Sequence, residues 1–113
     1  MIKGDVYLAV LDSSQGSQQP GTRPVIIVSR DAINMVSPVV VVVPLTSRTI
    51  KKRILPSQVE IKMGDGGLTT DSVALCEQVR AISTTRLMKP IGHLTTFSIS
   101  QINLALKIAL DLP

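Results

Sequence analysis

The chain has 113 residues, of which 44% are hydrophobic and 18% charged, and this apolar content predicts a single domain over residues 1–113 with its own core. Its longest apolar run, residues 39–45, is far shorter than the ~20 residues of a membrane span, and the N-terminus lacks a signal-peptide stretch, so a cytoplasmic location is expected. The net charge of +4 suits a polyanionic partner without proving one.

Runs rich in valine and isoleucine, separated by turn residues, predict a mainly β protein. The predicted strands cover residues 5–11, 24–29, 39–45, 54–62 and 72–82. The links between them are too short for the crossovers of a parallel sheet, so the pattern favours a strongly curved antiparallel sheet that closes toward a small barrel. Gly66 and Gly67 are expected to supply positive φ angles in a hairpin turn between the last two strands.

A helix is predicted at the end of the chain. Ser98 and Gln101 have the spacing of a capping box. Apolar residues then recur at helical spacing as far as Leu110, namely Ile99, Ile102, Leu106 and Ala109. The apolar face of this helix should cover one side of the sheet.

A loop rich in glycine and proline, residues 16–24, contains Arg23 just before an apolar strand. The guanidinium of Arg23 has five donors in a planar fork, and Pro24 holds its backbone extended. An arginine fixed where a loop meets a strand is well placed to bind a phosphate. The alternative is a solvated arginine that only ends the strand.

Two further polar features follow the valine run. Thr46 and Ser47 end the central strand with two hydroxyl groups, so a threonine and Arg23 could flank one phosphate. The basic run of Arg48, Lys51, Lys52 and Arg53 then predicts an exposed loop that contacts several phosphates. The alternative is a solvated loop whose charges keep two strand ends soluble.

The strand predicted over residues 72–82 carries a polar face. Ser72, Gln78 and Arg80 share this face by the two-residue period, directly after Asp71. Amides and hydroxyls of this kind read base edges, whereas only Tyr7 and Phe97 are available for stacking. Recognition of bases should therefore depend on hydrogen bonds.

Several kinds of catalytic site are excluded by the composition. His93 is the only histidine, so a nuclease with paired histidines cannot form within one subunit, and between apolar neighbours it is expected to be packed. Cys76 is the only cysteine, which rules out an internal disulfide and favours burial. The eight carboxylates are scattered without the spacing of a zinc or magnesium site, so no cofactor is expected.

Taken together, the order and spacing of these motifs resemble the MazF/PemK family of bacterial toxin endoribonucleases over nearly the whole chain. The matching landmarks are Gly4 to Tyr7, Gly16 and Ser17, Gly21 to Val25, Pro44 to Ser47, Leu55 and Pro56 before Val59 to Ile61, Asp71 to Val73, and Glu77 to Arg80. The resemblance implies an SH3-like, CcdB-like antiparallel barrel, a homodimer, and an antitoxin whose disordered segment wraps the dimer.

The resemblance also implies sequence-selective, metal-independent cleavage of single-stranded RNA, with Arg23 and Thr46 as the catalytic residues. The products would be a 2′,3′-cyclic phosphate and a 5′-hydroxyl. Arg23 would stabilise the negative charge, while Thr46 would hold a nonbridging oxygen, with Ser47 as a second donor. The expected RNA contacts are Gln18, Gln19, Ser47, Arg48, Lys51, Lys52, Arg53, Asp71, Ser72, Gln78 and Arg80.

One departure from the family bears on the mechanism. Many relatives have a glutamate in the first loop where this chain has Gln18, and an amide cannot accept a proton. Either the reaction needs no general base at this position, or the activity of this chain is reduced. Gln18 and Gln19 then become candidates for RNA contact. Two other functions remain open on the same fold: a CcdB-like poison that binds gyrase without cutting RNA, and a silent relative that only binds antitoxin.

Overall fold

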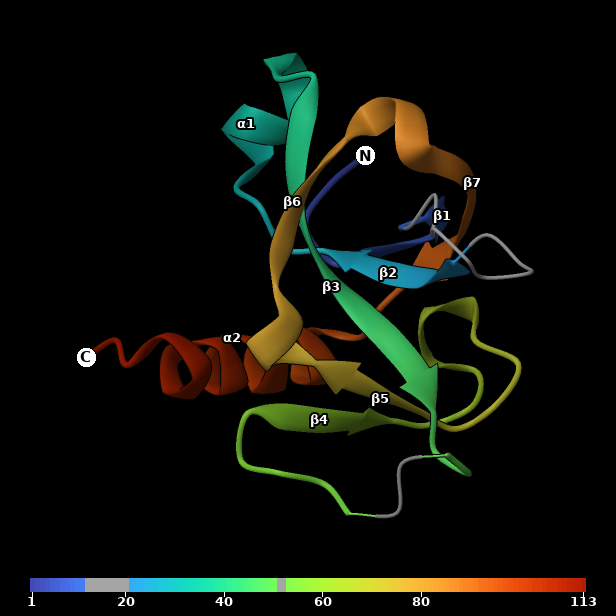
Figure 1. Cartoon of the computed structure of the whole chain (residues 1–113), viewed down its shortest axis with the longest axis vertical. Helices are drawn as coiled ribbons and strands as arrows, with labels where there is room; N and C mark the ends of the chain where they lie inside the picture. The colour runs from blue at the N-terminus through green and yellow to red at the C-terminus, as the bar shows by residue number, and fades with distance from the viewer. Residues whose placement is uncertain (12–20, 51–52) are drawn as a thin grey trace.

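The computed structural model describes residues 1–11, 21–50 and 53–113, and most of them form an antiparallel sheet with a helix at the C-terminus (Figure 1). The strands are β1 (Asp5–Val10), β2 (Thr22–Ile27), β3 (Val39–Ser47), β4 (Gln58–Ile61), β5 (Ser72–Leu75), β6 (Arg80–Ser83) and β7 (Leu87–His93). The helices are α1 (Asp31–Val36) and α2 (Thr96–Leu110), and three 3-10 turns are η1 (Asp65–Gly67), η2 (Cys76–Gln78) and η3 (Thr84–Arg86).

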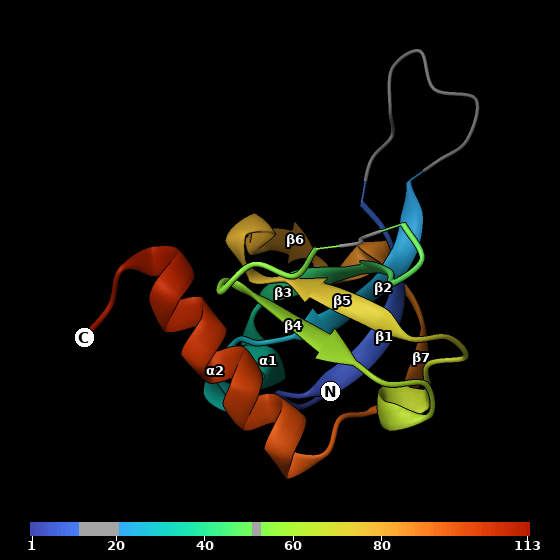
Figure 2. The same ribbon diagram turned by 90° about the horizontal axis from the view of Figure 1, so that it is seen from below.

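The strands follow the order β4-β5-β3-β2-β1-β7, with β6 paired to β3, and each recorded pair is antiparallel. The predicted mainly β, antiparallel fold with a C-terminal helix is therefore confirmed. Figure 2 shows the sheet curving strongly while α2 lies across one side. Within the described residues the order runs from β4 to β7 without joining its ends, so "barrel" describes the curvature and not a closed ring.

The strand predicted over residues 72–82 is wrong, because it is two strands separated by the turn η2. β5 pairs with Leu45 to Ser47, at the end of β3, whereas β6 pairs with Val39 to Val42, at its beginning. The gap between them includes Pro44, which has no N–H to offer a neighbouring strand. Ser72 and Arg80 therefore do not share one continuous strand face, and Gln78 lies in the turn.

Two elements were not predicted from the sequence pattern. β7 contains Pro90 and Gly92, residues that weaken a strand signal, and it lies at the end of the strand order, where proline is tolerated. The short helix α1 occupies the link between β2 and β3 that was expected to contain no helix. Its buried Asn34 donates to the backbone oxygen of Ser29 at 2.8 Å, which ties α1 to the end of β2.

The predicted capping box at Ser98 is wrong, because α2 begins one turn earlier. Thr95 is the N-cap, and its hydroxyl accepts a hydrogen bond from the Ser98 amide at 3.2 Å. Ser98 is instead buried, and its hydroxyl donates to Asp65 Oδ2 at 2.6 Å. The same carboxylate accepts from the Thr95 amide at 2.9 Å, so a residue of the turn η1 fixes the start of α2.

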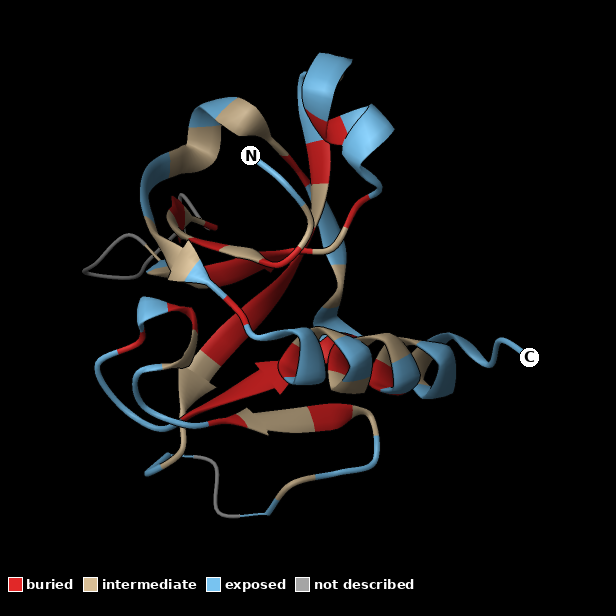
Figure 3. Ribbon diagram, turned by 180° about the vertical axis from the view of Figure 1, so that it is seen from behind, coloured by how far each residue is buried: buried red, intermediate tan, exposed pale blue. Residues whose placement is uncertain are grey.

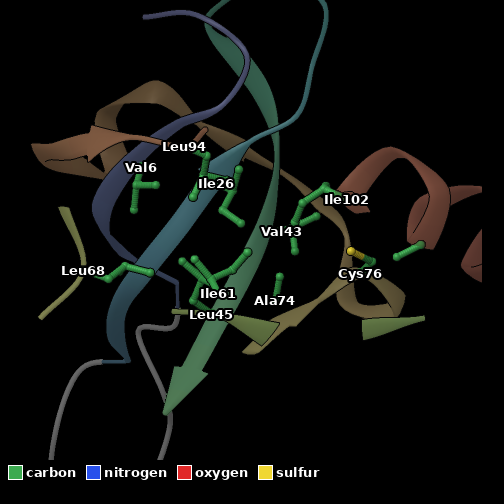
Figure 4. Close-up of a cluster of buried hydrophobic side chains, with 11 residues drawn as sticks. Val6, Ile26, Val43, Leu45, Ile61, Leu68, Ala74, Cys76, Leu94 and Ile102 are labelled. Atoms are coloured by element: carbon green, nitrogen blue, oxygen red, sulfur yellow. The ribbon is translucent and has the colours of Figure 1, made fainter. Parts of the chain in front are cut away.

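Buried residues lie along the central strands and on α2 (Figure 3). Their apolar side chains form two cores, one on each face of the central strands. On β2, Ile26 points into the first core, while Val25 and Ile27 point into the second, as the two-residue period requires. The first core, covered by α2, is shown in Figure 4 and consists of Val6, Ile26, Val43, Leu45, Ile61, Leu68, Ala74, Cys76, Leu94, Ile102 and Ala105. The second core consists of Ala9, Leu11, Val25, Ile27, Val40, Val42 and Ile82.

The expected burial of Cys76 is confirmed, since its side chain is fully enclosed in the first core. Burial, with a smaller contribution from the charge of Glu77, raises the pKa of the thiol from 9.0 to about 12. The unfolded chain therefore loses this proton near pH 9, whereas the folded protein keeps it up to about pH 12.

Because the unfolded state alone is deprotonated in this window, the thiol's contribution to stability falls as the pH rises above 9. The slope should approach about 1 kcal/mol per pH unit. We expect the free energy of unfolding, measured by urea titration between pH 8 and pH 10.5, to decline more steeply for the wild type than for Cys76→Ala. Parallel slopes for the two proteins would contradict this prediction.

Candidate functional site

Arg23 lies within β2, one residue after the strand begins, and is half-buried. It is paired with Ala9 of β1, and the two-residue period places it on the same face as Val25 and Ile27. The strand thus starts slightly before the predicted position, and Arg23 is fixed by the sheet itself. Gln18 and Gln19, predicted beside it in the loop, lie outside the described residues.

Thr46 lies near the end of β3 and is also half-buried. The register of β2 and β3 pairs Val25 with Pro44 and Ile27 with Val42. Continued for two more residues, this register sets Arg23 opposite Thr46. Opposite residues of an antiparallel pair share a face, so both side chains lie on the same face at the same end of neighbouring strands.

The pairing of β2 with β3 stops just before this point. β3 continues as the partner of β5, with Thr46 opposite Val73. The recorded pairs join the second half of β2 to the middle of β3, and Figure 1 shows the two strands diverging beyond them. An arginine and a threonine are both donors that bind a phosphate well.

The basic run is partly neutralised by an acidic neighbour. Arg48 Nε lies 3.5 Å from Glu60 Oε2, and Lys62 Nζ lies 3.3 Å from the same oxygen. Arg53 is exposed, and Lys51 and Lys52 lie outside the described residues. Two cations of this run, Arg48 and Arg53, lie in the described part of the chain. Arg48 is an ion-pair partner of Glu60, and Arg53 is the more exposed to solvent.

Three of the predicted RNA contacts take part in the local structure. The Ser47 hydroxyl bonds with that of Thr49 at 2.8 Å, within a tight turn. Asp71 Oδ1 accepts from the Met63 amide at 2.8 Å, and Ser72 is buried with its hydroxyl donating to the oxygen of Thr70 at 3.0 Å. Their contact with RNA stays a prediction.

Gln78 and Arg80 are exposed, but they do not adjoin the pair of Arg23 and Thr46 along the sheet. Arg80 is opposite Val42, four residues from Thr46 on β3, which corresponds to about 13 Å along the strand. Continuation of the β2–β3 register thus places Arg23 opposite Thr46, whereas Arg80 is paired farther back along β3.

Arg86 supports the site and was missed in the sequence. Its Nη1 donates to the backbone oxygens of Val10 at 3.2 Å and Leu11 at 3.1 Å. The Leu11 amide in turn donates to the oxygen of Gly21 at 2.8 Å. Arg86 thus holds the end of β1 against which Arg23 is registered, and no motif signals this contact because its partners are backbone atoms.

The expectation that His93 is packed is wrong. The histidine is exposed, and its Nδ1 lies 2.8 Å from Oδ1 of Asp5, across the pairing of β7 with β1. Gly92 and Leu94, its neighbours in the chain, are more enclosed. The apolar neighbours thus did not bury the ring, because the edge strand β7 turns its side chain outward.

Among residues 1–11, 21–50 and 53–113, no three His, Cys, Asp or Glu side chains come together in a way that could hold a metal ion. Within the same part of the chain, no helix has both the length and the apolar character that crossing a membrane requires.

Comparison with known proteins shows that residues 2–110 of this chain match one protein family, the PemK-like, MazF-like toxins of type II toxin-antitoxin systems. The chain belongs to this family. A curated relative in the family, the endoribonuclease MazF of Staphylococcus saprophyticus, is 42% identical over 112 residues, which cover 99% of this chain and 92% of the relative.

Solved structures in the same family have the same fold. An endoribonuclease from a mycobacterial species, in complex with its cognate antitoxin, is 28% identical with a TM-score of 0.83, and the match covers 100% of this chain and 97% of that one. The Mycobacterium tuberculosis toxin MazF-mt6 is 27% identical with a TM-score of 0.80, covering 96% and 98%. The resemblance predicted from the sequence motifs is therefore confirmed.

Proposed function

We propose that this toxin is an endoribonuclease that cuts single-stranded RNA in the cytoplasm, without a metal ion and with sequence selectivity, by means of Arg23 and Thr46. Family membership makes it the toxin of a type II toxin-antitoxin system, and its 42% identical relative is an endoribonuclease. The observation that carries the proposed mechanism is the shared face of Arg23 and Thr46 at the diverging ends of β2 and β3.

In the proposed reaction, the 2′-hydroxyl of RNA attacks the adjacent phosphorus and the bond to the 5′ oxygen breaks. The products are a 2′,3′-cyclic phosphate and a 5′-hydroxyl. Negative charge grows on the nonbridging oxygens, and Arg23 is placed to stabilise it because a guanidinium stays charged at any working pH. Thr46 donates its hydroxyl to one of the same oxygens.

A proton must leave the 2′-hydroxyl and another must reach the leaving oxygen. Arginine is a poor proton donor, because its pKa lies above ~12, so we assign Arg23 to charge stabilisation. No described carboxylate is placed beside Arg23 by the strand registers, whose neighbours there are Ala9 and, by continuation, Thr46. The general base is therefore left unassigned.

We also propose that the exposed Arg53, Gln78 and Arg80 contact the RNA on either side of the cut, together with the other predicted contacts. Residues 1–113 would act as one toxin domain, since both cores draw on strands from several parts of the chain. The mycobacterial endoribonuclease has been solved with its cognate antitoxin, and we propose that this toxin binds an antitoxin of its own.

A homodimer is proposed as the active form. Around α1, the side chains of Met35 and Val36 are 79% and 83% exposed, and Ile33 and Val39 beside them are also exposed. An apolar surface of this kind on a small protein is typical of an interface between subunits. Light scattering at micromolar concentration should give the mass of two chains, and a monomer there would contradict this part of the proposal.

The central test is cleavage of a long RNA by the purified protein in excess EDTA, with the 5′ ends of the fragments mapped. We expect cleavage to persist at a recurring short sequence and to leave 5′-hydroxyl ends, which accept phosphate from a kinase without prior phosphatase treatment. Cleavage that stops in EDTA and returns with Mg²⁺ would overturn the metal-independent mechanism. DNA breakage with intact RNA after induction would favour the gyrase poison instead.

A further inference from the structure

A carboxylate lies on the same face of the sheet as Thr46. In the register of β3, β5 and β4, Thr46 is opposite Val73, and Val73 is opposite Glu60. Opposite residues of antiparallel strands share a face, so Glu60 lies on the face of Thr46, two strand spacings or roughly 10 Å away. Figure 1 shows β3 ending beside β5, with β4 on the far side of β5.

Arg48 joins this face at the end of β3. Its amide donates to the Asp71 oxygen at 2.9 Å, which continues the pairing of β3 with β5 by one more residue. Arg48 lies two positions after Thr46, so the period of the strand puts both side chains on one face, about 7 Å apart along the chain. The distance of 3.5 Å from Arg48 Nε to Glu60 Oε2 agrees with this placement.

Glu60 joins two cations across β5. Its Oε2 atom is shared by Arg48 Nε and, at 3.3 Å, by Lys62 Nζ. Val73, which lies between β3 and β4 on this face, is fully buried, and the Arg48 and Glu60 side chains are only 33% and 29% exposed. A carboxylate in these surroundings restricts a guanidinium more than a fully solvated surface pair would.

The charge and the position of this cluster favour a phosphate of the RNA. Two cations and one carboxylate leave a net positive charge, and a guanidinium and an ammonium are both phosphate-binding groups. A single strand of RNA has one phosphate for each nucleotide. If its scissile phosphate lies at Arg23 and Thr46, RNA that runs toward the end of β3 presents its next phosphate to Arg48 on the same face.

We propose that Arg48 and Lys62 bind the phosphate next to the scissile one, and that Glu60 is a positioning residue for Arg48. The carboxylate holds the guanidinium over β5, so less side-chain freedom is lost when the RNA binds. This inference rests on the proposed function, because it assumes that the substrate lies at Arg23 and Thr46. It adds Glu60 and Lys62 to the residues predicted from the sequence.

The test measures binding to single-stranded DNA, which lacks the attacking 2′-hydroxyl and is not cut by the proposed reaction. Fluorescence anisotropy with a labelled strand of mixed sequence, about 12 nucleotides long, gives Kd between roughly 50 and 200 mM salt. Each lost phosphate contact lowers the slope of log Kd against log salt by about 0.7. Arg48→Gln should therefore lower the slope by about 0.7 and weaken binding about fivefold, and Lys62→Gln should weaken it about twofold.

Glu60→Gln separates positioning from simple charge. The substitution keeps the shape of the side chain and raises the net charge of the protein by one, so removal of a carboxylate that only screens its neighbours would tighten binding. We expect instead about threefold weaker binding and a smaller salt slope, because Arg48 is no longer held. The matched control is Asp111→Asn, which makes the same charge change at the exposed end of α2 and should bind at least as tightly as the wild type.

The double variant Arg48→Gln/Glu60→Gln tests whether the two residues act together. It should bind no more weakly than Arg48→Gln alone, because the carboxylate then has no guanidinium to position. In RNA cleavage, Glu60→Gln should raise KM and leave kcat unchanged, since the cluster binds a phosphate that does not react.

The inference is overturned if Glu60→Gln binds the DNA as tightly as the wild type or more tightly, because Glu60 then only screens the two cations. It is also overturned if Arg48→Gln and Lys62→Gln both leave Kd and the salt slope unchanged. A wild type that binds through this cluster yet cuts no RNA would refute the proposed cleavage alone. RNA cleavage by the wild type, with all variants unaltered, would refute the role of the cluster alone.

Discussion

Replacement of Arg23 by alanine is expected to lower the rate of RNA cleavage at least about a hundredfold, which corresponds to ~3 kcal/mol of transition-state stabilisation. The physical reason is that charge develops on the phosphate oxygens only as the reaction proceeds. The pairing of β2 with β1 fixes the backbone of Arg23, and the proposal requires its guanidinium to face that charge. The loss should therefore appear in kcat rather than in KM.

The measurement is initial-rate cleavage of a short fluorogenic RNA that contains the mapped sequence. Thr46→Val keeps the shape of the side chain but removes its hydroxyl, and it should cost about tenfold or more in kcat, since a neutral donor is weaker than a cation. Arg30→Ala is the matched control, because Arg30 is an exposed arginine at the opposite end of β2 and precedes α1.

If Arg23→Ala cleaves RNA as fast as the wild type, Arg23 is not a catalytic residue, although the chain still belongs to the family. Equal losses in Arg23→Ala and Arg30→Ala would point to a general effect of positive charge on RNA binding. A large rise in KM with unchanged kcat would move Arg23 from charge stabilisation to substrate binding.

The strands that could be predicted from the sequence are those whose own side chains indicate that the strand is buried. β1, β2 and β3 were placed to within a few residues, because runs of valine and isoleucine persist where both faces of a strand are covered. Here each face has its own core, so Val25 and Ile26 are both buried though they point in opposite directions.

The elements that were missed depend on distant parts of the chain. The division of residues 72–82 into β5 and β6 follows from how β3 shares its length between partners. The start of α2 is decided by Asp65, which lies 30 residues before Thr95 in the sequence. Local spacing therefore favoured Ser98 as the cap, while a tertiary hydrogen bond selected Thr95.

The proposed site shows the same division. Arg23 and Thr46 each carried a local signal, a loop that ends in a strand and a strand that ends in hydroxyls. That the two residues lie opposite each other follows from continuing the register of β2 and β3. This register could not be read from the sequence, because α1 stands between the two strands. Arg86 carried no signal at all, because its contacts with the backbone of Val10 and Leu11 bridge 76 and 75 residues.

Gly92→Ala is expected to destabilise the protein by about 3 kcal/mol, at the upper end of the cost of overpacking. A Cβ at Gly92 would lie 2.6 Å from both the carbonyl carbon and the oxygen of Gly66, and 2.8 Å from the Gly67 nitrogen. These are backbone atoms of the turn η1, which cannot rotate away as a side chain can. The turn must therefore move off β7.

Thermal unfolding followed by circular dichroism should show the melting temperature of Gly92→Ala lowered by about 12 °C, given ~4 °C or more per kcal/mol for a chain of this size. Gly64→Ala is the matched control, because a Cβ there would meet nothing within 4 Å and only its φ of +96° opposes the change. That strain alone should cost about 1 kcal/mol. Equal shifts for the two variants would show that crowding between η1 and β7 contributes nothing, and that the turn can shift away from the strand without loss.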